Sequence, residues 1–529
     1  MKIPDSIKVL VLVAWLCLPS MAVLSTDLVQ GGAEGLAVLA FSIFIWACPL
    51  VLLPKLKQYL LLCTPLALLI LPYAYMTVVY NSVPGDALVS ASIHSDSAHA
   101  LDVLRGFGWK LALIPVSALA YFMLARSISS PLHLSMARRK GLLAFLLLYA
   151  MSGMFVRQTL AKSVKMPALF EEYTANLSFP SNFVLSLQRV LRQHGAQSDL
   201  ASVRGRAAGA SAPLLVVLVI GESVRSDHLG INGYARATTP KLAAMGQALI
   251  TFPDVASTAN WTYAAVPNIV SRPVRRERAS LVGTFKEAGF MTAWLSNQEP
   301  ALYNGGADVS EFSDSEMDRH LRKDSTLLPL FKSFVRQAGP RQFVVLHMNG
   351  SHEPYDERYG GDSRIFAPTL SDIGVGFPHL EHKAEAINSY DNSIVELDTF
   401  LAQVIRALDA EARPAIVLFT SDHGENLFDD RRGLFMHAGS VATRADTHVP
   451  MLAWMNRPYL TQYPALAAAL RANAGKKISH RNIFPSLLEL GGIDWDQRAP
   501  EDSFASGHFL EKRRMAMSNV DEHDYDTLK

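Results

Sequence analysis

The long apolar segments of this chain all lie before residue 160, and this uneven distribution is the feature that most constrains its fold. A helix needs about 20 mostly apolar residues to cross the roughly 30 Å hydrocarbon core of a membrane. Five segments approach that length, and they are Ile7–Ser25, Leu36–Leu53, Tyr59–Tyr80, Trp109–Leu124 and Leu142–Phe155. We therefore predict an α-helical membrane domain with five transmembrane helices. The first segment would alternatively fit a cleaved signal peptide, because Lys2 and Lys8 precede its apolar core.

The distribution of lysine and arginine predicts the orientation of these helices, because short loops rich in both stay in the cytoplasm. Basic residues begin the first segment and occupy the loops before the third and fifth, as Lys2, Lys8, Lys55, Lys57, Arg126, Arg138, Arg139 and Lys140. The intervening loops, at 26–35 and 81–108, are mainly acidic. The N-terminus is therefore expected inside. Five crossings then place the rest of the chain outside, in the periplasm if the protein is a multi-pass inner-membrane protein of a two-membrane bacterium.

The composition divides the chain into three predicted parts: a membrane domain at 1–157, a connector at 158–210 and a periplasmic domain at 211–529. Cationic and apolar residues alternate in the connector, which predicts either a helix lying at the lipid interface or a solvated linker. The small residues of Gly205–Ser211 suit a hinge. The 81–108 loop carries His94, Asp96 and His99, which would either reach the site from the membrane side or simply form a polar loop.

Short, continuous apolar runs replace the long ones after residue 212, and they predict an α/β fold. The runs are Leu214–Ile220, Thr292–Leu295, Phe343–Leu346, Ala415–Thr420 and Pro450–Trp454, and helical stretches such as Ala384–Leu408 separate them. Runs of this kind are typical of buried parallel strands. Ligands of such sheets bind at the carboxyl ends of the strands.

Polar side chains collect at three of these strand ends. Glu222 follows the first run, His347 and His352 follow the third, and the adjacent pair Asp422 and His423 follows the fourth, with His437 further along. Histidine nitrogens and carboxylate oxygens together are ligands that suit zinc. The recurrence of such groups at one edge of the sheet predicts a metal site there.

Several motifs of this region resemble those of the membrane-anchored phosphoethanolamine transferases, which belong to the alkaline phosphatase and sulfatase superfamily. These enzymes modify lipid A and lipopolysaccharide core and include the mobile colistin-resistance (polymyxin-resistance) proteins. The motifs run in family order, as Gly221-Glu222-Ser223, Asn232-Gly233-Tyr234, Thr238-Thr239-Pro240, Gly350-Ser351-His352 and Ser421-Asp422-His423-Gly424-Glu425. The resemblance covers nearly the whole chain and implies an alkaline-phosphatase-like catalytic domain after the membrane helices.

The resemblance also implies the roles of individual residues. The family's nucleophile is a threonine ahead of a Val-Pro step, which matches Thr262 before Val266-Pro267, with Thr258 as the runner-up. The implied zinc ligands are Glu222, Thr262, Asp422 and His423. His347, His352 and His437 resemble the substrate-side catalytic histidines, and some of them would help to hold a second ion, so one zinc ion or two are expected.

The chain departs from the family in its cysteines. All three of its cysteines, Cys17, Cys48 and Cys63, lie in the apolar segments, so the disulfides common near the family's nucleophile are missing and packing must supply rigidity there. The run Trp294-Leu295-Ser296-Asn297-Gln298 is closer to the enzymes that modify core sugars than to the lipid A branch. The acceptor therefore stays open between lipid A, a core sugar and a periplasmic glucan.

The expected reaction transfers phosphoethanolamine from phosphatidylethanolamine to a lipopolysaccharide acceptor through a covalent intermediate on Thr262, and it releases diacylglycerol. The partners are membrane lipid and an envelope glycan, and the protein is expected to act as a monomer. The net charge of +1 argues against nucleic acid as a partner. The main alternative is a phosphoglycerol transferase acting on a periplasmic glucan or another envelope polymer. A sulfatase would need a Cys or Ser in a C/S-x-P-x-R motif, and a pure binding protein would usually lack a ligand or the nucleophile.

Overall fold

The computed structural model describes most of the chain and divides it into two compact units. It describes residues 3–26, 28–29, 32–53, 55–86, 89, 111–129, 133–159, 172–197, 200–201, 205–207, 212–274, 277–298, 304–312, 323–337, 339–496 and 498–528. Unit 1 comprises Met1–Leu191 with the short pieces Gly439–Val441 and Asn519–Asp521, and unit 2 comprises the rest. Most of the predicted connector is described, whereas most of the 81–108 loop, including His94, Asp96 and His99, lies outside the described residues.

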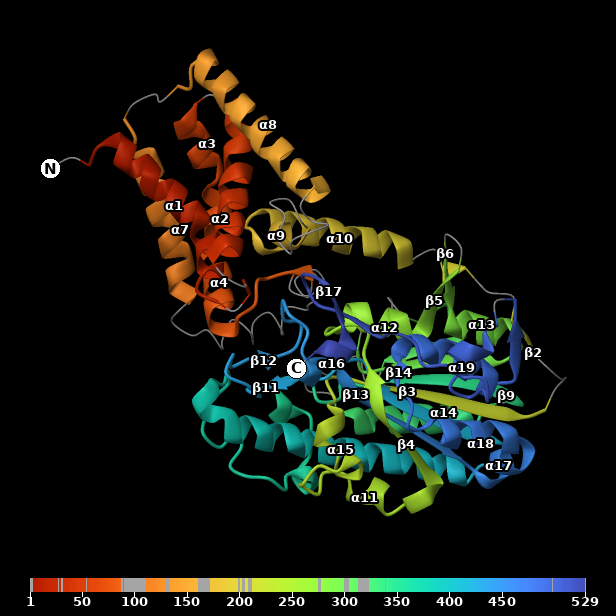
Figure 1. Cartoon of the computed structure of the whole chain (residues 1–529). Coiled ribbons are helices and arrows are strands. Elements are labelled where there is room, and N and C mark those ends of the chain that lie inside the picture. The colour runs from red at the N-terminus through yellow and green to blue at the C-terminus, as the bar shows by residue number, and fades with distance from the viewer. Residues whose placement is uncertain are drawn as a thin grey trace. The chain divides into compact units, whose positions relative to one another are not determined.

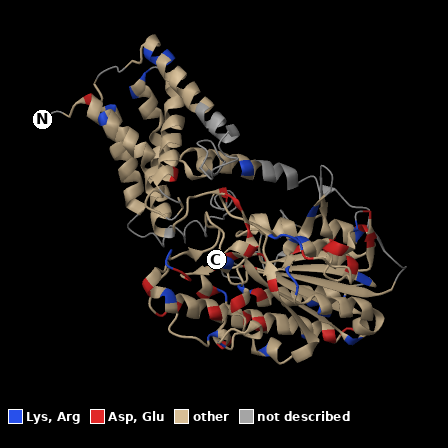
Figure 2. Ribbon diagram, viewed as in Figure 1, with Lys and Arg blue, Asp and Glu red and all other residues tan. Residues whose placement is uncertain are grey.

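Unit 1 is helical, and helices form over all five predicted apolar segments (Figure 1). Its helices are α1 (Asp5–Val23), α2 (Gly32–Ala47) with the 3₁₀ turn η1 (Cys48–Val51), α3 (Leu56–Leu62), α4 (Thr64–Tyr80), α7 (Leu113–Arg126), α8 (Met136–Thr159), α9 (Glu172–Leu177) and α10 (Ser181–Gln197). Figure 2 shows few charged residues on the helices from α1 to α7. An apolar surface of this kind suits contact with lipid.

The lengths of the described helices support two or three membrane crossings. Among the described residues, Asp5–Val23 and Gly32–Val51 are long and apolar enough to cross a membrane. The helices α3 and α4 add a third crossing if the pair, bent by 57°, forms one span. The helix α7 is apolar but shorter. Two or three spans are thus supported, and five remains a prediction.

Unit 2 is built on an eight-stranded sheet with helices on both faces (Figure 1). In spatial order the strands are β14 (Ile478–Ser479), β4 (Leu249–Ala256), β13 (His448–Met455), β10 (Ala415–Ser421), β3 (Leu214–Gly221), β9 (Arg341–His347), β7 (Met291–Ser296) and β8 (Val309–Phe312). The five strands from β10 to β8 run parallel to one another. All eight residues of β3 are buried, as expected of a central strand covered on both sides.

The five runs predicted as strands all form strands, but one prediction about them is wrong. The strand β13, which contains Pro450–Trp454, pairs antiparallel with both β10 and β4 instead of running parallel. Its amino end therefore lies at the edge where β3 and β10 end. The strand β4 was not predicted, because Thr251, Pro253 and Asp254 interrupt its apolar residues.

Two cores lie against the sheet, one on each face, because alternate side chains of a strand point to opposite sides. Leu214, Val216, Leu218 and Ile220 of β3 join the core beneath α12 (Thr262–Val270), α13 (Leu281–Glu287), α18 (Pro464–Asn473) and α19 (Ile483–Leu490). Leu215, Val217 and Val219 join the core beneath α14 (Leu327–Val335) and α15 (Lys383–Asp409). The helix α15 covers the predicted stretch Ala384–Leu408.

Short elements complete unit 2. The helices are α11 (Pro240–Ala243), α16 (Arg444–Thr447) and α17 (Arg457–Gln462). The strands are β1 (Leu200–Ala201), β2 (Gly205–Ala207), β5 (Ser271–Val274), β6 (Glu277–Ser280), β11 (Asn426–Leu427), β12 (Phe435–Met436), β15 (Ile493–Trp495), β16 (Met515–Met517) and β17 (Glu522–Asp524). Lys and Arg are interspersed with Asp and Glu over this unit (Figure 2).

Candidate active site

The register of the central strands brings the predicted metal ligands together. Gly221 of β3 pairs with Ser421 of β10, so the next residues, Glu222 and Asp422, leave the sheet side by side at the same edge. The backbone N–H of Asp422 donates to the carbonyl of Gly221 at 3.0 Å, which holds the two strand ends together beyond the last pair. Both carboxyl side chains are fully buried. Two acids without solvent at one strand edge are costly unless a cation or hydrogen bonds compensate them.

Thr262 is the first residue of α12, and its hydroxyl meets this pair of strand ends. Its Oγ1 donates to Oε2 of Glu222 at 3.0 Å and lies 3.2 Å from Nε2 of His423. The preceding residue, Trp261, has extended backbone angles and ends the loop that leads from β4 into the helix. The free N–H groups at a helix start favour negative charge, which suits a developing oxyanion or a phosphoryl group at Thr262.

The runner-up nucleophile, Thr258, lies apart from this cluster. It is 3 % exposed, and among the described residues its hydroxyl has no hydrogen-bond partner. Its carbonyl accepts from the N–H of Met517 in β16 at 2.9 Å. Of the two candidates, the structure brings Thr262 to the carboxylates.

Hydrogen bonds hold the loop that leads to Thr262 against neighbouring segments. The N–H of Asn260 donates to the carbonyl of Met517 at 3.0 Å, and the N–H of Ala438 donates to the carbonyl of Asn260 at 2.7 Å. The hydroxyl of Ser257 donates to the carbonyl of Asp422 at 2.5 Å. These hydrogen bonds tie the loop to β16 and to the segments that carry Asp422 and His437, and the rigidity expected from packing stays a prediction.

The orientation of His423 prepares it to bind a metal. Its Nδ1 lies 2.8 Å from the carbonyl of Gly424 and donates to it, which directs Nε2 toward the carboxylates. Nε2 lies 3.1 Å from Oε1 of Glu222 and 3.4 Å from Oδ2 of Asp422. That Oδ2 is buried and accepts no hydrogen bond from the residues that the structure describes. A buried carboxylate oxygen that accepts no hydrogen bond is consistent with a ligand position for a metal ion.

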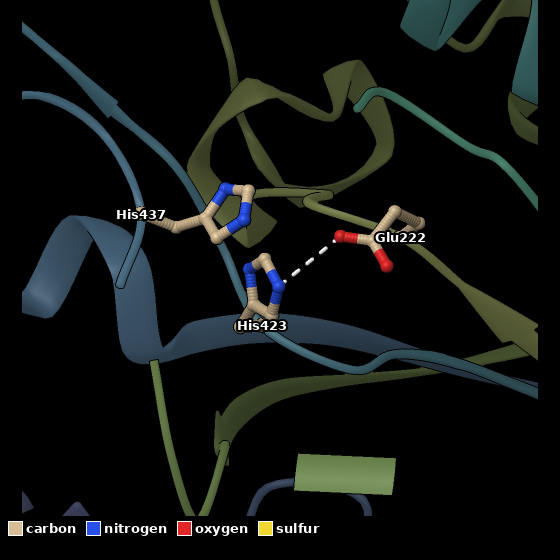
Figure 3. Close-up of side chains that lie close together, drawn as sticks. All are labelled: Glu222, His423 and His437. Atoms are coloured by element: carbon tan, nitrogen blue, oxygen red, sulfur yellow. Dashed lines mark ion pairs between the residues drawn. The ribbon is translucent and has the colours of Figure 1, made fainter. Parts of the chain in front are cut away.

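The spacing of these atoms suits zinc. Four ligands at the usual zinc distances lie about 3.3 Å from one another in a tetrahedron. The separations between Thr262 Oγ1, His423 Nε2 and the nearest carboxylate oxygens run from 3.0 to 3.4 Å. Figure 3 shows His437 facing the same centre, and Glu222, His423 and His437 offer ligand atoms within 4.8 Å of one another. This tight group contains His437 and not Asp422, so the assignment of individual ligands stays a prediction.

The charges of the cluster also call for a cation. Burial disfavours a charged His423, but Asp422 and Glu222 outweigh burial and raise the pKa of its imidazole to about 10. Burial and the Glu222 carboxylate raise the pKa of Asp422 above its ordinary value. Burial opposes the charge of Glu222, but the proximity of His423 lowers its pKa well below the ordinary value. A divalent cation would take over the role of the His423 proton, because metal binding displaces protons from its ligands.

His437 is held by a buried carboxyl group. Its Nδ1 lies 2.8 Å from Oε2 of Glu425, whose Oε1 accepts from the hydroxyl of Tyr355 at 3.1 Å. Burial lowers the pKa of His437 to about 3 and raises that of Glu425 to about 8. Its ring centroid lies 4.1 Å from that of His423. A neutral imidazole beside the predicted metal ligands can accept a proton from a hydroxyl group.

The other two predicted histidines lie at different depths. The ring centroid of His352 lies 5.4 Å from that of His437, and its Nδ1 donates to the carbonyl of Glu353 at 2.6 Å. Burial lowers its pKa to about 3. His347 is fully buried, 3.3 Å from the hydroxyl of Ser296 and edge-on to Trp294, and burial lowers its pKa to about 4. It lies outside the tight group of three, and its catalytic role stays a prediction.

Two side chains that touch Glu222 were not predicted. Ser223 donates from Oγ to Oε1 of Glu222 at 2.8 Å, and Gln298 donates from Nε2 to Oε2 at 2.9 Å. The contact from Ser223 could have been predicted, because Ser223 is adjacent to Glu222 in the sequence. The contact from Gln298 could not, because Gln298 follows a different strand of the sheet.

Comparison with known proteins agrees with this geometry. A family model described as Sulfatase matches residues 215–493, which is more than half of the chain. The chain belongs to the sulfatase family. Phosphoethanolamine transferase EptC of Escherichia coli (strain K12) is 22% identical over 522 residues, which cover 92% of this chain and 89% of EptC. YhbX of the same strain is 31% identical over 246 residues, so the match spans 42% of its length and 45% of this chain. The predicted resemblance to phosphoethanolamine transferases is confirmed.

The fold of this sulfatase-family chain extends through its helical part. Integral membrane protein EptA of Neisseria meningitidis, a lipooligosaccharide phosphoethanolamine transferase, superposes with a TM-score of 0.72 at 22% identity, covering 95% of this chain and 99% of EptA. The periplasmic domain of EcEptC from Escherichia coli, solved in complex with Zn, gives a TM-score of 0.56 at 23% identity and covers 62% of this chain and 97% of that domain. The alkaline-phosphatase-like fold with apolar helices ahead of it is therefore confirmed.

Proposed function

We propose that the protein transfers phosphoethanolamine from phosphatidylethanolamine to a lipopolysaccharide acceptor, on lipid A or on a core sugar. The observation that carries the proposal is the Thr262 hydroxyl at the start of α12, 3.0 Å from Glu222 and 3.2 Å from His423 Nε2. The names of the relatives that align over most of this chain, EptC and CptA, support phosphoethanolamine as the transferred group. A Salmonella typhimurium relative, named for transfer to Kdo(2)-lipid A, supports a lipopolysaccharide acceptor.

The transfer proceeds in two displacements on Thr262. In the first, Oγ1 forms a bond to the phosphorus of phosphatidylethanolamine, and the bond from phosphorus to the diacylglycerol oxygen breaks. The diacylglycerol oxygen takes up a proton, and phosphoethanolamine remains on the threonine. In the second, an acceptor oxygen forms a bond to phosphorus, the bond to Oγ1 breaks, and Thr262 regains its proton.

Glu222, Thr262, Asp422 and His423 would hold zinc, which lowers the pKa of the threonine hydroxyl and neutralises charge on the phosphoryl oxygens. The residues themselves orient the nucleophile, since the carboxylate of Glu222 fixes the direction of the Thr262 O–H bond. The helix start of α12 favours the negative charge that gathers around Thr262 during attack. The number of ions, one or two, is left to metal analysis.

His437 and His352 move the protons of this proposal. Nδ1 of His437 is hydrogen-bonded to Glu425, so proton exchange with a substrate would take place at Nε2. Nδ1 of His352 is likewise committed to the carbonyl of Glu353. With pKa values lowered to about 3, both rings are neutral at pH 7, and the proposal assigns them proton exchange with the leaving or the acceptor oxygen. His347, the last residue of β9, is the third histidine that the proposal assigns to the site.

A membrane tether serves this chemistry because the donor, and a lipid-linked acceptor, lie in the same membrane. The proposal places 1–157 in the bacterial inner membrane as a multi-pass domain, 158–210 as a connector and 211–529 in the periplasm. Confining the site near the lipid surface raises the effective concentration of both substrates. The protein acts as a monomer in this scheme.

Mass spectrometry of the purified protein and of envelope lipids and glycans tests the proposal. A tryptic peptide with Thr262 should carry an added mass of about 123 Da, the formula weight of one phosphoethanolamine unit, and Thr262→Ala should abolish both this adduct and the modified acceptor. An adduct of about 154 Da would instead identify phosphoglycerol transfer. If the Thr262→Ala variant still transferred phosphoethanolamine, the covalent scheme would be refuted.

A further inference from the structure

Gln298 reaches the site from two strands away. It follows β7, which ends at Ser296, and β7 pairs with β9, which pairs with β3. Two strand spacings amount to about 10 Å. Nε2 of Gln298 bridges the gap by donating to the carbonyl of Met348, just after β9, at 2.7 Å, and to Oε2 of Glu222, just after β3, at 2.9 Å. The length of glutamine is what makes this bridge possible.

The backbone of Gln298 is fixed by its own turn. Its N–H donates to Oγ of Ser296 at 2.9 Å, and that hydroxyl donates to the carbonyl of Gln298 at 2.6 Å. The N–H of Asn297 donates to the carbonyl of His347 at 2.9 Å. Because the turn is bonded both to itself and to β9, the amide of Gln298 arrives at Glu222 from a defined direction.

A buried carboxyl group joins this turn to the loop beside Glu222. Oδ1 of Asp324 accepts from Nδ2 of Asn297 at 2.7 Å and from the N–H of Asn349 at 2.8 Å. Its Oδ2 accepts from the N–H of Gly350 at 2.9 Å. Neither Asp324 nor Gln298 is hydrogen-bonded to Thr262. Gln298 binds Glu222 directly, and Asp324 binds the backbone and side chains beside it.

The hydrogen bonds of Glu222 show why the glutamine matters. Oε1 accepts from Ser223, whereas Oε2 accepts from Thr262 and from Gln298. The bond from Thr262 is lost whenever its hydroxyl gives up its proton to become a nucleophile. Among the described residues, the contact from Gln298 is then the remaining side-chain hydrogen bond to Oε2. A fully buried carboxylate that loses its donors loses both its orientation and its solvation.

We propose that Gln298 is a positioning residue that keeps the Glu222 carboxylate directed at Thr262 and at the zinc throughout the transfer. This inference rests on the proposed function, since it assigns a role toward the same metal and nucleophile. Loss of an outer hydrogen-bond partner of a metal ligand usually costs about 10- to 100-fold in metal affinity or activity. A cost of that size is expected here.

The experiment compares the full-length, detergent-solubilised protein with Gln298→Met, which keeps the length of the side chain and removes the amide. Gln298→Glu is the second variant, and it puts a carboxylate against Glu222. Gln247→Met is the matched control, because Gln247 is exposed in the 3₁₀ turn Gly246–Ala248 that precedes β4. For each, the zinc dissociation constant is measured by competition with a chelator, and kcat and KM for phosphatidylethanolamine are measured beside the thermal unfolding midpoint.

Zinc binding of Gln298→Met should weaken about 10- to 100-fold, kcat should fall by a similar factor, and KM should change little. Gln298→Glu should lose more kcat, because a second carboxylate repels Glu222, and Gln247→Met should match the unsubstituted protein. Should either Gln298 variant fold and keep both zinc affinity and kcat within twofold, the inference is overturned and the proposed function stands. Unsubstituted protein with no measurable zinc affinity would overturn the proposed function and this inference together.

Discussion

Gly350 offers the sharpest test of how closely the site is built. Its φ of +52° lies in the left-handed region, and a Cβ placed on it would lie 2.5 Å from the carbonyl oxygen of Glu222 and 2.6 Å from its nitrogen. Ordinary contacts begin at 3.4 Å, so in Gly350→Ala the Glu222 backbone must retreat by about 0.9 Å, the difference between 3.4 and 2.5 Å. These are backbone atoms at a strand end, which have little freedom to move.

Such a shift carries Glu222 away from Thr262 and the metal. A misplacement of about 1 Å in a catalytic group costs on the order of 100-fold in rate. We therefore expect Gly350→Ala to lower kcat about 100-fold and to weaken zinc binding, as measured by turnover and by chelator competition. The left-handed backbone adds a destabilisation of about 1 kcal/mol for alanine.

Gly374→Ala separates the two effects. Gly374 has a φ of +67°, and a Cβ there meets nothing within 4 Å. This control should pay the same backbone cost of about 1 kcal/mol and keep its zinc affinity and kcat. If Gly350→Ala behaved like Gly374→Ala in both assays, the close approach to Glu222 would have no functional meaning and the reasoning would fail.

Three further predictions concern metal, pH and stability. Removal of zinc by a chelator should abolish transfer and its return should restore it, because Glu222, Asp422 and His423 leave a buried negative site; transfer that persists in metal-free protein would contradict this. In metal-free protein the pKa of His423 is raised to about 10, so the stabilisation by its charge is complete below about pH 6.5 and is lost as pH rises toward 10. Thermal unfolding of the chelated protein should show this decline, and His423→Gln should lack it. Arg514, whose side chain is 2 % exposed, pairs with Asp254 and Asp526, so Arg514→Met should destabilise the protein by about 2 kcal/mol in denaturant titrations, less than a fully buried pair because both partners are 30 % exposed; a loss under about 0.5 kcal/mol would show that the pairs are dispensable.

The sequence predicted the centre of the site because the chemistry of parallel strands is local. Glu222 and Asp422 each follow a continuous apolar run, and two parallel strands that end together must deliver the next residues to one edge. Thr262 was predicted as the nucleophile from its resemblance to a family motif; its hydroxyl contacts Glu222, and its role as the nucleophile stays a prediction. The long apolar segments likewise predicted helices, because a run of about 20 apolar residues has few other stable forms in lipid.

Features that depend on strand order and direction could not be predicted from local patterns. An apolar run reads the same in both directions, so the antiparallel pairing of β13 depends on its connection to β10 and on its partner β4. The number of membrane crossings also depends on geometry that hydropathy leaves open, because the 57° bend between α3 and α4 decides whether the two helices form one span.

The sequence alone determined which residue types stand at the strand ends, and from them it predicted a threonine nucleophile and a zinc site built from two acids and several histidines. Only the tertiary structure decided that Gln298 spans from β7 to Glu222, that His437 is joined to Glu425, and that Gly350 lies against the Glu222 backbone. Residue patterns report interactions within one strand or helix. Contacts between side chains from separate strands exist only after the sheet has assembled in one order and register.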